Sequence, residues 1–185
     1  MGCFLTGHAR IQQTNRRRLW KLLDNELFKD SDGTIRMAPR NMPSDCYTIP
    51  MWIAWIAGSP IDFDTRGSHI HDQTCYNHET LIVDMTEEEL KEKKLLRYSE
   101  KNKMWVCEDI PVGFLRKKEI SRKDANDILY RCMESANIPL LNRIIIRIGV
   151  FFNVGWFFDK WFGKVFSLDF DRVYEEAYWR ENLGK

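Results

Sequence analysis

Apolar positions in the first part of the chain recur at helical spacing. Four leucines between positions 19 and 27 follow a three-and-four pattern, which predicts an amphipathic helix over residues 14–30. The run Asp30-Ser31-Asp32-Gly33 is a turn signal that ends this helix. Residues 34–47 include two prolines and are expected to form a loop or a short strand.

Further along, two helix starts are marked by a hydroxyl residue with an acidic residue three positions later. Such a pair satisfies the free N–H groups of the first helical turn. The pairs and their predicted helices are Thr86 with Glu89 (85–94) and Ser121 with Asp124 (121 to about 135). Between them, residues 101–114 read as a strand or hairpin centred on Met104-Trp105-Val106-Cys107. An earlier helix is expected over residues 65–83.

The most apolar segment is 144–158. Its longest uncharged run is far short of the roughly 20 residues that a membrane span needs. We expect a core helix here, with a helix lying on a membrane surface as the alternative. After it, Phe166, Phe170, Tyr174 and Tyr178 are spaced by four, which predicts an aromatic stripe on a C-terminal helix over 161–185.

Composition narrows the class of protein. The 185 residues are 44% hydrophobic, with 7 Trp, 6 Tyr and 11 Phe, which predicts one folded domain with an aromatic-rich core. The net charge of +1 argues against a nucleic-acid partner. The 5 cysteines are scattered without metal-ligand spacing, so reduced thiols in a cytosolic product are expected.

One polar constellation suggests chemistry. His71 and Asp72 are neighbours on the predicted 65–83 helix, and Asp127 lies on the helix that follows Ser121. A histidine that takes a proton from water needs an acceptor on its other ring nitrogen, and Asp127 is a candidate for that role. The alternative is a buried hydrogen-bonded network with no catalytic role. The nearby His69 and His78 are expected to be surface or capping residues.

The order of three segments resembles the phospholipase A2 pattern. These segments are Pro60-Ile61-Asp62, then His71-Asp72-Gln73-Thr74-Cys75-Tyr76, then Asp127. The resemblance implies His71 as general base, Asp127 as the carboxylate that orients it, and Asp72 as a calcium ligand. Calcium is therefore the implied cofactor. The chain has no glycine-rich loop of the kind that presents backbone carbonyls to calcium.

A longer resemblance, over residues 40–160, is to the phage-associated domain family of unknown function 1353. Five parts of the chain match successive parts of the family's pattern. They are Asp45 to Pro50, the tryptophans Trp52 and Trp55, His71-Asp72, the stretch Ala125 to Tyr130, and Arg147 with Gly149 and Trp156. The family's Gly-Ala-Ser turn is replaced by Cys46-Tyr47-Thr48, Tyr76 comes one residue late, and Asn126 stands before Asp127. Tyr76, Asp45 and Arg122 are the supporting site residues.

These patterns predict a single, mainly α domain over 1–185, with a small β element and the His71 helix packed on the Asp127 helix. Residues 1–35 are expected to form a helical N-terminal segment. The leading function is a phage virion-associated or structural protein that keeps a phospholipase-like site. The alternatives are a metal-assisted phospholipid hydrolase and a lysis or host-interaction accessory protein. Expected partners are other phage structural proteins, further copies of the chain, or a lipid surface. The expected location is the host cytoplasm and then the virion.

Overall fold

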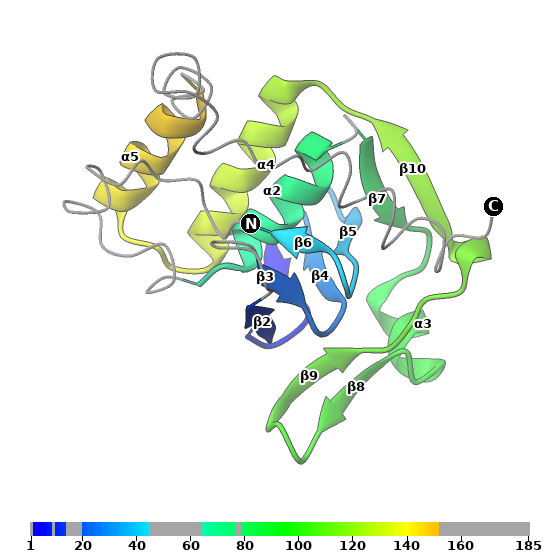
Figure 1. Cartoon of the computed structure of the whole chain (residues 1–185). Helices are drawn as coiled ribbons and strands as arrows, with labels where there is room; N and C mark the ends of the chain where they lie inside the picture. Colours follow the sequence, from blue (N-terminus) through cyan, green and yellow to red (C-terminus); the bar gives the residue numbers. More distant parts are fainter. Residues whose placement is uncertain (1, 9, 14–19, 45–63, 77–78, 152–185) are drawn as a thin grey trace.

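A computed structural model describes residues 2–8, 10–13, 20–44, 64–76 and 79–151 (Figure 1). Its centre is a five-stranded antiparallel sheet with strand order β1-β4-β5-β7-β10. The strands of this sheet are β1 (Cys3–Phe4), β4 (Glu26–Lys29), β5 (Ile35–Ala38), β7 (Glu79–Val83) and β10 (Leu115–Glu119).

Two smaller sheets and four helices complete the described part of the fold. The helices are α2 (Arg66–Tyr76), α3 (Glu87–Glu92), α4 (Arg122–Ser135) and α5 (Leu140–Phe151). A three-stranded sheet consists of β2 (Ile11–Gln13), β3 (Trp20–Leu22) and β6 (Pro43–Ser44), and a hairpin of β8 (Leu96–Ser99) and β9 (Met104–Cys107). A 3-10 turn, η1 (Val112–Phe114), leads into β10.

Strand β4 shows how the main sheet separates two cores. Phe28 belongs to a buried cluster with Ile70 of α2 and Ile128 of α4, whereas Leu27 belongs to a cluster with Leu90 of α3 and Leu96 of β8. Neighbouring residues in a strand point to opposite faces. The sheet is therefore covered on both faces, and α2 and α4 lie side by side over one of them (Figure 1).

The expectation of a mainly helical domain is wrong, because the centre of the molecule is an antiparallel sheet. The helix predicted over 14–30, and with it the helical segment over 1–35, is replaced in its described residues by strands β1 to β4. The cause is burial on both faces. In β4, the neighbours Leu27 and Phe28 are both fully buried, so this strand lacks the polar alternation that marks a half-buried strand.

The predicted 65–83 helix is correct only in its first part. Helix α2 ends at Tyr76, and Glu79–Val83 continue as β7, which pairs with β5 and β10. The expected packing of the His71 helix on the later helix is confirmed, because α2 packs against α4.

The helix caps, the turn and the strand that were predicted from residues close together in the chain are confirmed. Thr86 and Glu89 form a reciprocal capping box at α3, and the Ser121 hydroxyl accepts the backbone N–H of Asp124 at the start of α4. The Asp30–Gly33 turn joins β4 to β5, with Gly33 at φ 86°, a conformation that glycine adopts without strain. The predicted strand around Met104–Cys107 is β9.

The described residues do not form the expected aromatic-rich core. Among them, Phe28 is the one aromatic side chain in the buried hydrophobic core, and the others are aliphatic residues, methionines and cysteines. Most of the tryptophans and phenylalanines that raise the aromatic content lie outside the described residues, as does the predicted 161–185 helix.

Candidate functional site

The predicted constellation sits where α2 crosses α4. Helix α2 begins at Arg66, whose backbone N–H is accepted by the Asp64 carboxylate. One and a half turns later, His71 and Asp72 project from the helix about 100° apart. Their side chains are 12% and 20% exposed, so solvent reaches both.

His71 pairs with Asn126 rather than with Asp127. The Nε2 atom of His71 lies 3.1 Å from Oδ1 of Asn126 on α4. Asp127 instead accepts a hydrogen bond from Arg147 of α5, at 3.4 Å. The residue in direct contact with His71 is thus the neighbour of Asp127, and the role of Asp127 in orienting His71 stays a prediction.

The physical reason is the rotation between neighbours on a helix. Ala125, Ile128, Leu129 and Cys132 form the buried side of α4. Asn126 and Asp127 stand about 100° apart on the helix. In this orientation Asn126 contacts α2 and Asp127 contacts α5. The spacing of residues along the sequence places both near the site and does not say which one contacts His71.

The identity of this partner changes the chemistry. A carboxylate only accepts hydrogen bonds and carries a charge that stabilises an imidazolium. The Asn126 amide offers an acceptor and two donors without any charge. It can hold the His71 ring in place, but it does not stabilise the positive charge that His71 gains on taking a proton from water.

Asp72 is attached to the sheet side of the site. The Ser44 hydroxyl, fully buried at the end of β6, donates to Oδ2 of Asp72 at 2.6 Å. The other oxygen, Oδ1, lies 3.8 Å from Nδ1 of His71, beyond hydrogen-bond distance. Ser44, Asp72, His71 and Asn126 thus form a polar chain that links β6, α2 and α4.

Calcium at Asp72 stays a prediction. Calcium takes six to eight oxygen ligands. No group of three or more His, Cys, Asp or Glu side chains suited to a metal ion occurs within the described ranges. Among the described contacts, Asp72 accepts a hydrogen bond from Ser44.

The structure describes little of the residues predicted to support the site. Asp45 and His78 lie outside the described residues, and only the backbone of Tyr76 is described, as the last residue of α2. Arg122 opens α4 with an exposed side chain. Their assignment to a site remains a prediction.

A second histidine on α2, His69, has a carboxylate partner in the sheet. Its Nδ1 lies 2.9 Å from Oε2 of Glu26 in β4, with side chains 0% and 3% exposed. The expectation that His69 is a surface or capping residue is wrong. The two histidines are two residues apart, about 200° around the helix, so His69 faces the sheet. The signal that identifies it is an acidic residue inside an apolar strand, in Glu26-Leu27-Phe28.

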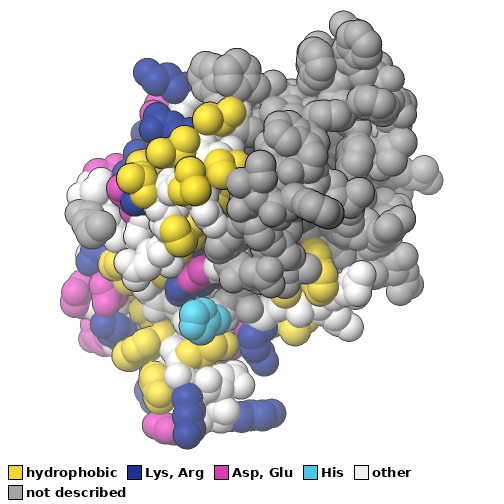
Figure 2. Space-filling view, turned by 90° about the vertical axis from the view of Figure 1, so that its left-hand side faces the viewer, with side chains coloured by type: hydrophobic (Ala, Val, Ile, Leu, Met, Phe, Trp, Pro, Cys, Tyr) yellow, Lys and Arg dark blue, Asp and Glu magenta, His cyan; other side chains and the backbone are white. Residues whose placement is uncertain are grey.

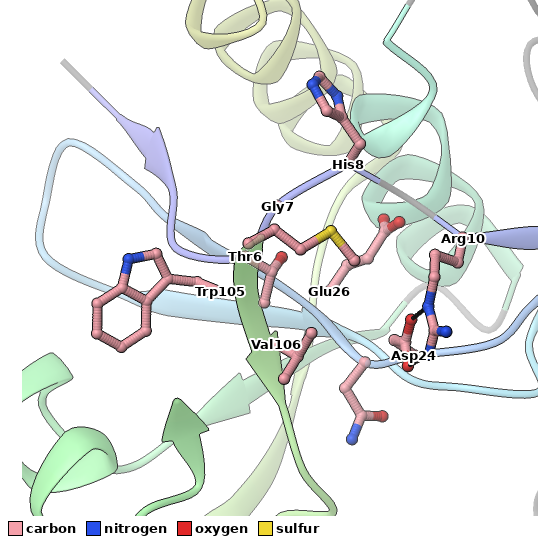
Figure 3. Close-up of a pocket in the computed structure, with 10 residues that line it drawn as sticks. Thr6, Gly7, His8, Arg10, Asp24, Glu26, Trp105 and Val106 are labelled. Atoms are coloured by element: carbon pink, nitrogen blue, oxygen red, sulfur yellow. Dashed lines mark hydrogen bonds and ion pairs between the residues drawn. The ribbon is translucent and has the colours of Figure 1, made fainter. Parts of the chain in front are cut away.

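Beside Glu26 is a cavity of about 10 Å³, the size of one water molecule. Figure 3 shows Glu26 among its lining residues, with His8 and Arg10 from the N-terminal segment and Trp105 from β9. Within the described structure, Oε1 of Glu26 is buried without a hydrogen-bond partner. The cavity is too small for an organic substrate.

A larger cavity of about 220 Å³ opens between the N-terminal segment and the β8–β9 hairpin. Three arginines line it, and each is paired with a carboxylate that also lines it: Arg10 with Asp24, Arg40 with Asp109 and Arg97 with Glu108. Charges of both signs therefore balance within its lining, and this cavity has no preference for an anionic or a cationic ligand.

Comparison of the chain with models of protein families, with curated proteins and with solved structures finds no match.

Proposed function

We propose that the chain is a virion-associated structural protein of a bacteriophage in which the His71 site holds elements together and does not turn over an ester. The observation that carries this proposal is the contact between His71 and Asn126. A hydrogen bond between a histidine and an amide on two packed helices is of the kind that fixes packing.

The remaining contacts of the site support the same function. The Ser44 hydroxyl donates to Asp72 between β6 and α2, and His71 contacts Asn126 between α2 and α4. In both cases the two elements are distant in sequence. These two hydrogen bonds join β6 and α4 to α2. The phage assignment rests on the resemblance of residues 40–160 to the phage-associated family of unknown function 1353.

The alternative is a phospholipid hydrolase with His71 as general base. It is favoured by the partial exposure of His71 and Asp72, which leaves the ring open to water and substrate. An amide can also orient a catalytic histidine, as in the Cys-His-Asn arrangement of papain-like proteases. In such an enzyme, His71 would take a proton from water and Asp72 would lie beside the developing oxyanion.

Virion composition tests the structural assignment. Particles of the encoding phage, purified on a density gradient and washed at high salt, should contain peptides of this chain at a fixed ratio to the major capsid protein. Mass spectrometry of the purified particles and of the unassembled lysate fraction measures this ratio. The assignment is wrong if the chain is found in the lysate fraction alone.

A further inference from the structure

Helix α5 turns an apolar face to solvent. Leu140, Leu141, Ile144 and Ile148 are between 43% and 63% exposed. Their spacing places them along one side of the helix. Figure 2 faces the side of the molecule on which α5 lies in Figure 1, and apolar side chains gather there. Of the core helix predicted over 144–158, residues 152–158 lie outside the described residues, and among the described side chains of α5 Ile146 is the one that is buried.

The two charged residues of α5 lie at one edge of this face and contact α4. Arg143 donates to Glu134 of α4 at 2.7 Å and Arg147 donates to Asp127 at 3.4 Å. Both guanidinium groups also lie over the ring of Tyr130, at 5.3 and 4.9 Å from its centroid. An ordinary surface helix turns its apolar residues inward and its charges outward. In α5, by contrast, four aliphatic side chains face solvent and Arg143, 17% exposed, packs against α4.

We propose that this face of α5 docks on an anionic lipid surface. The proposal is independent of the function proposed for the His71 site. The face, formed by Leu140, Leu141, Ile144 and Ile148, would lie among the acyl chains at the headgroup boundary. The helix would then lie parallel to the membrane. No helix among the described residues is long and apolar enough to cross a membrane, so the docking is peripheral.

Charge favours lipid over a protein partner. Arg143 and Arg147 are the only charged residues between positions 140 and 158, so the segment is purely basic. Arg147 is 54% exposed and its ion pair with Asp127 is long, which leaves it able to contact a phosphate. A stable protein interface needs about 800 Å² from each partner, more than four half-exposed aliphatic side chains offer.

The sequence that follows α5 also supports a lipid surface as the partner. Residues 151–162 include Phe151, Phe152, Trp156, Phe157, Phe158, Trp161 and Phe162. Tryptophan and phenylalanine are favoured at membrane interfaces, beside basic residues. The lipid-binding signature therefore continues beyond the helix that carries the exposed face.

Flotation of the full-length protein with vesicles tests this inference. The wild type should float with vesicles of phosphatidylglycerol and phosphatidylcholine and much less with phosphatidylcholine alone. The double variant L141Q/I144Q should reduce the partition coefficient by about a hundredfold, because two aliphatic side chains no longer leave water. Raising the salt concentration should weaken the binding of the wild type.

The matched control is V112Q, which changes another exposed aliphatic residue, 52% exposed in η1. It should float like the wild type, and all variants should keep the wild-type circular dichroism spectrum, because the changed side chains are exposed. The proposal is overturned if the wild type does not bind anionic vesicles, or if L141Q/I144Q binds as well as V112Q. Self-association that L141Q/I144Q abolishes, without vesicle binding, would assign this face to a second copy instead.

Discussion

Asp30→Asn should lower the free energy of unfolding by about 3–5 kcal/mol, the usual cost of removing one partner from a buried ion pair. Asp30 has a side chain 2% exposed and receives two hydrogen bonds from Arg131 of α4, at 2.7 and 2.8 Å, and one from Arg36 of β5, at 3.3 Å. The substitution leaves Arg36, itself 8% exposed, without its buried carboxylate. Urea unfolding at neutral pH measures the loss.

The same cluster predicts an acid-dependent stability. Burial alone would raise the pKa of Asp30, but hydrogen bonds from Arg131 and from the Ser31 backbone, with the charges of Arg131 and Arg36, hold this pKa below its ordinary value. A carboxyl with a lowered pKa stabilises the fold above its unfolded pKa of about 4 and loses this contribution as the pH falls further. The wild type should therefore lose stability on acidification below about pH 5, and Asp30→Asn should lose less.

Asp84→Asn is the control, because Asp84 pairs with Arg116 on the surface, where both side chains are about half exposed. It should change the unfolding midpoint little. An Asp30→Asn variant as stable as Asp84→Asn would mean that the cluster does not hold β4, β5 and α4 together.

His69→Ala should also cost about 3–5 kcal/mol, because it leaves the Glu26 carboxylate buried without its partner. Glu26 has no other hydrogen-bond partner in the described structure, and its Oε1 is already unpaired. The double variant Glu26→Leu/His69→Leu should recover most of this loss, since apolar residues of similar volume often replace a buried pair at little cost. Chemical denaturation of the two variants and the wild type gives the comparison.

The double variant is the informative part of this experiment. If it is as unstable as His69→Ala, the loss comes from a cavity or from other contacts of His69, and the Glu26 pair is not the cause. His69→Ala with near wild-type stability would contradict the buried pairing itself.

The features that the sequence predicted correctly are local. The caps at Thr86 and Ser121 depend on side chains that bond to backbone three residues away, so no tertiary information is needed. The Asp30–Gly33 turn depends on residues that adopt turn conformations readily. In each case the residues that make the contact are neighbours in the chain.

The centre of the sheet could not be predicted because its inner strands, β4, β5 and β7, are buried on two faces. Leu27 and Phe28 are adjacent and both apolar, yet they belong to different cores. A strand of this kind has no period of two, and the leucines before it matched helical spacing by coincidence. Pairing between distant strands, such as β5 with β7, leaves no mark in a local pattern.

The sequence predicted which elements meet at the site, and it did not indicate that Asn126 contacts His71. Residues 71, 72 and the 126–127 pair are brought together, because α2 packs on α4. Which of Asn126 and Asp127 faces His71 depends on the rotation of α4 about its axis, set by the burial of Ala125, Ile128 and Cys132. The Glu26–His69 pair was missed because both residues were assigned to helices. The two residues are also 43 positions apart in the sequence.

The central claim is that the His71 site does not turn over an ester, and phospholipid hydrolysis by purified wild-type protein tests it most directly. The assay measures fatty-acid release from vesicles at millimolar calcium, beside His71→Asn. The structure-based expectation is background release from both proteins, with His71→Asn less stable by about 1–3 kcal/mol through its unsatisfied partner. Release by the wild type that falls by about 10²–10⁴-fold in a folded His71→Asn variant, the size of a lost general base, would contradict the claim.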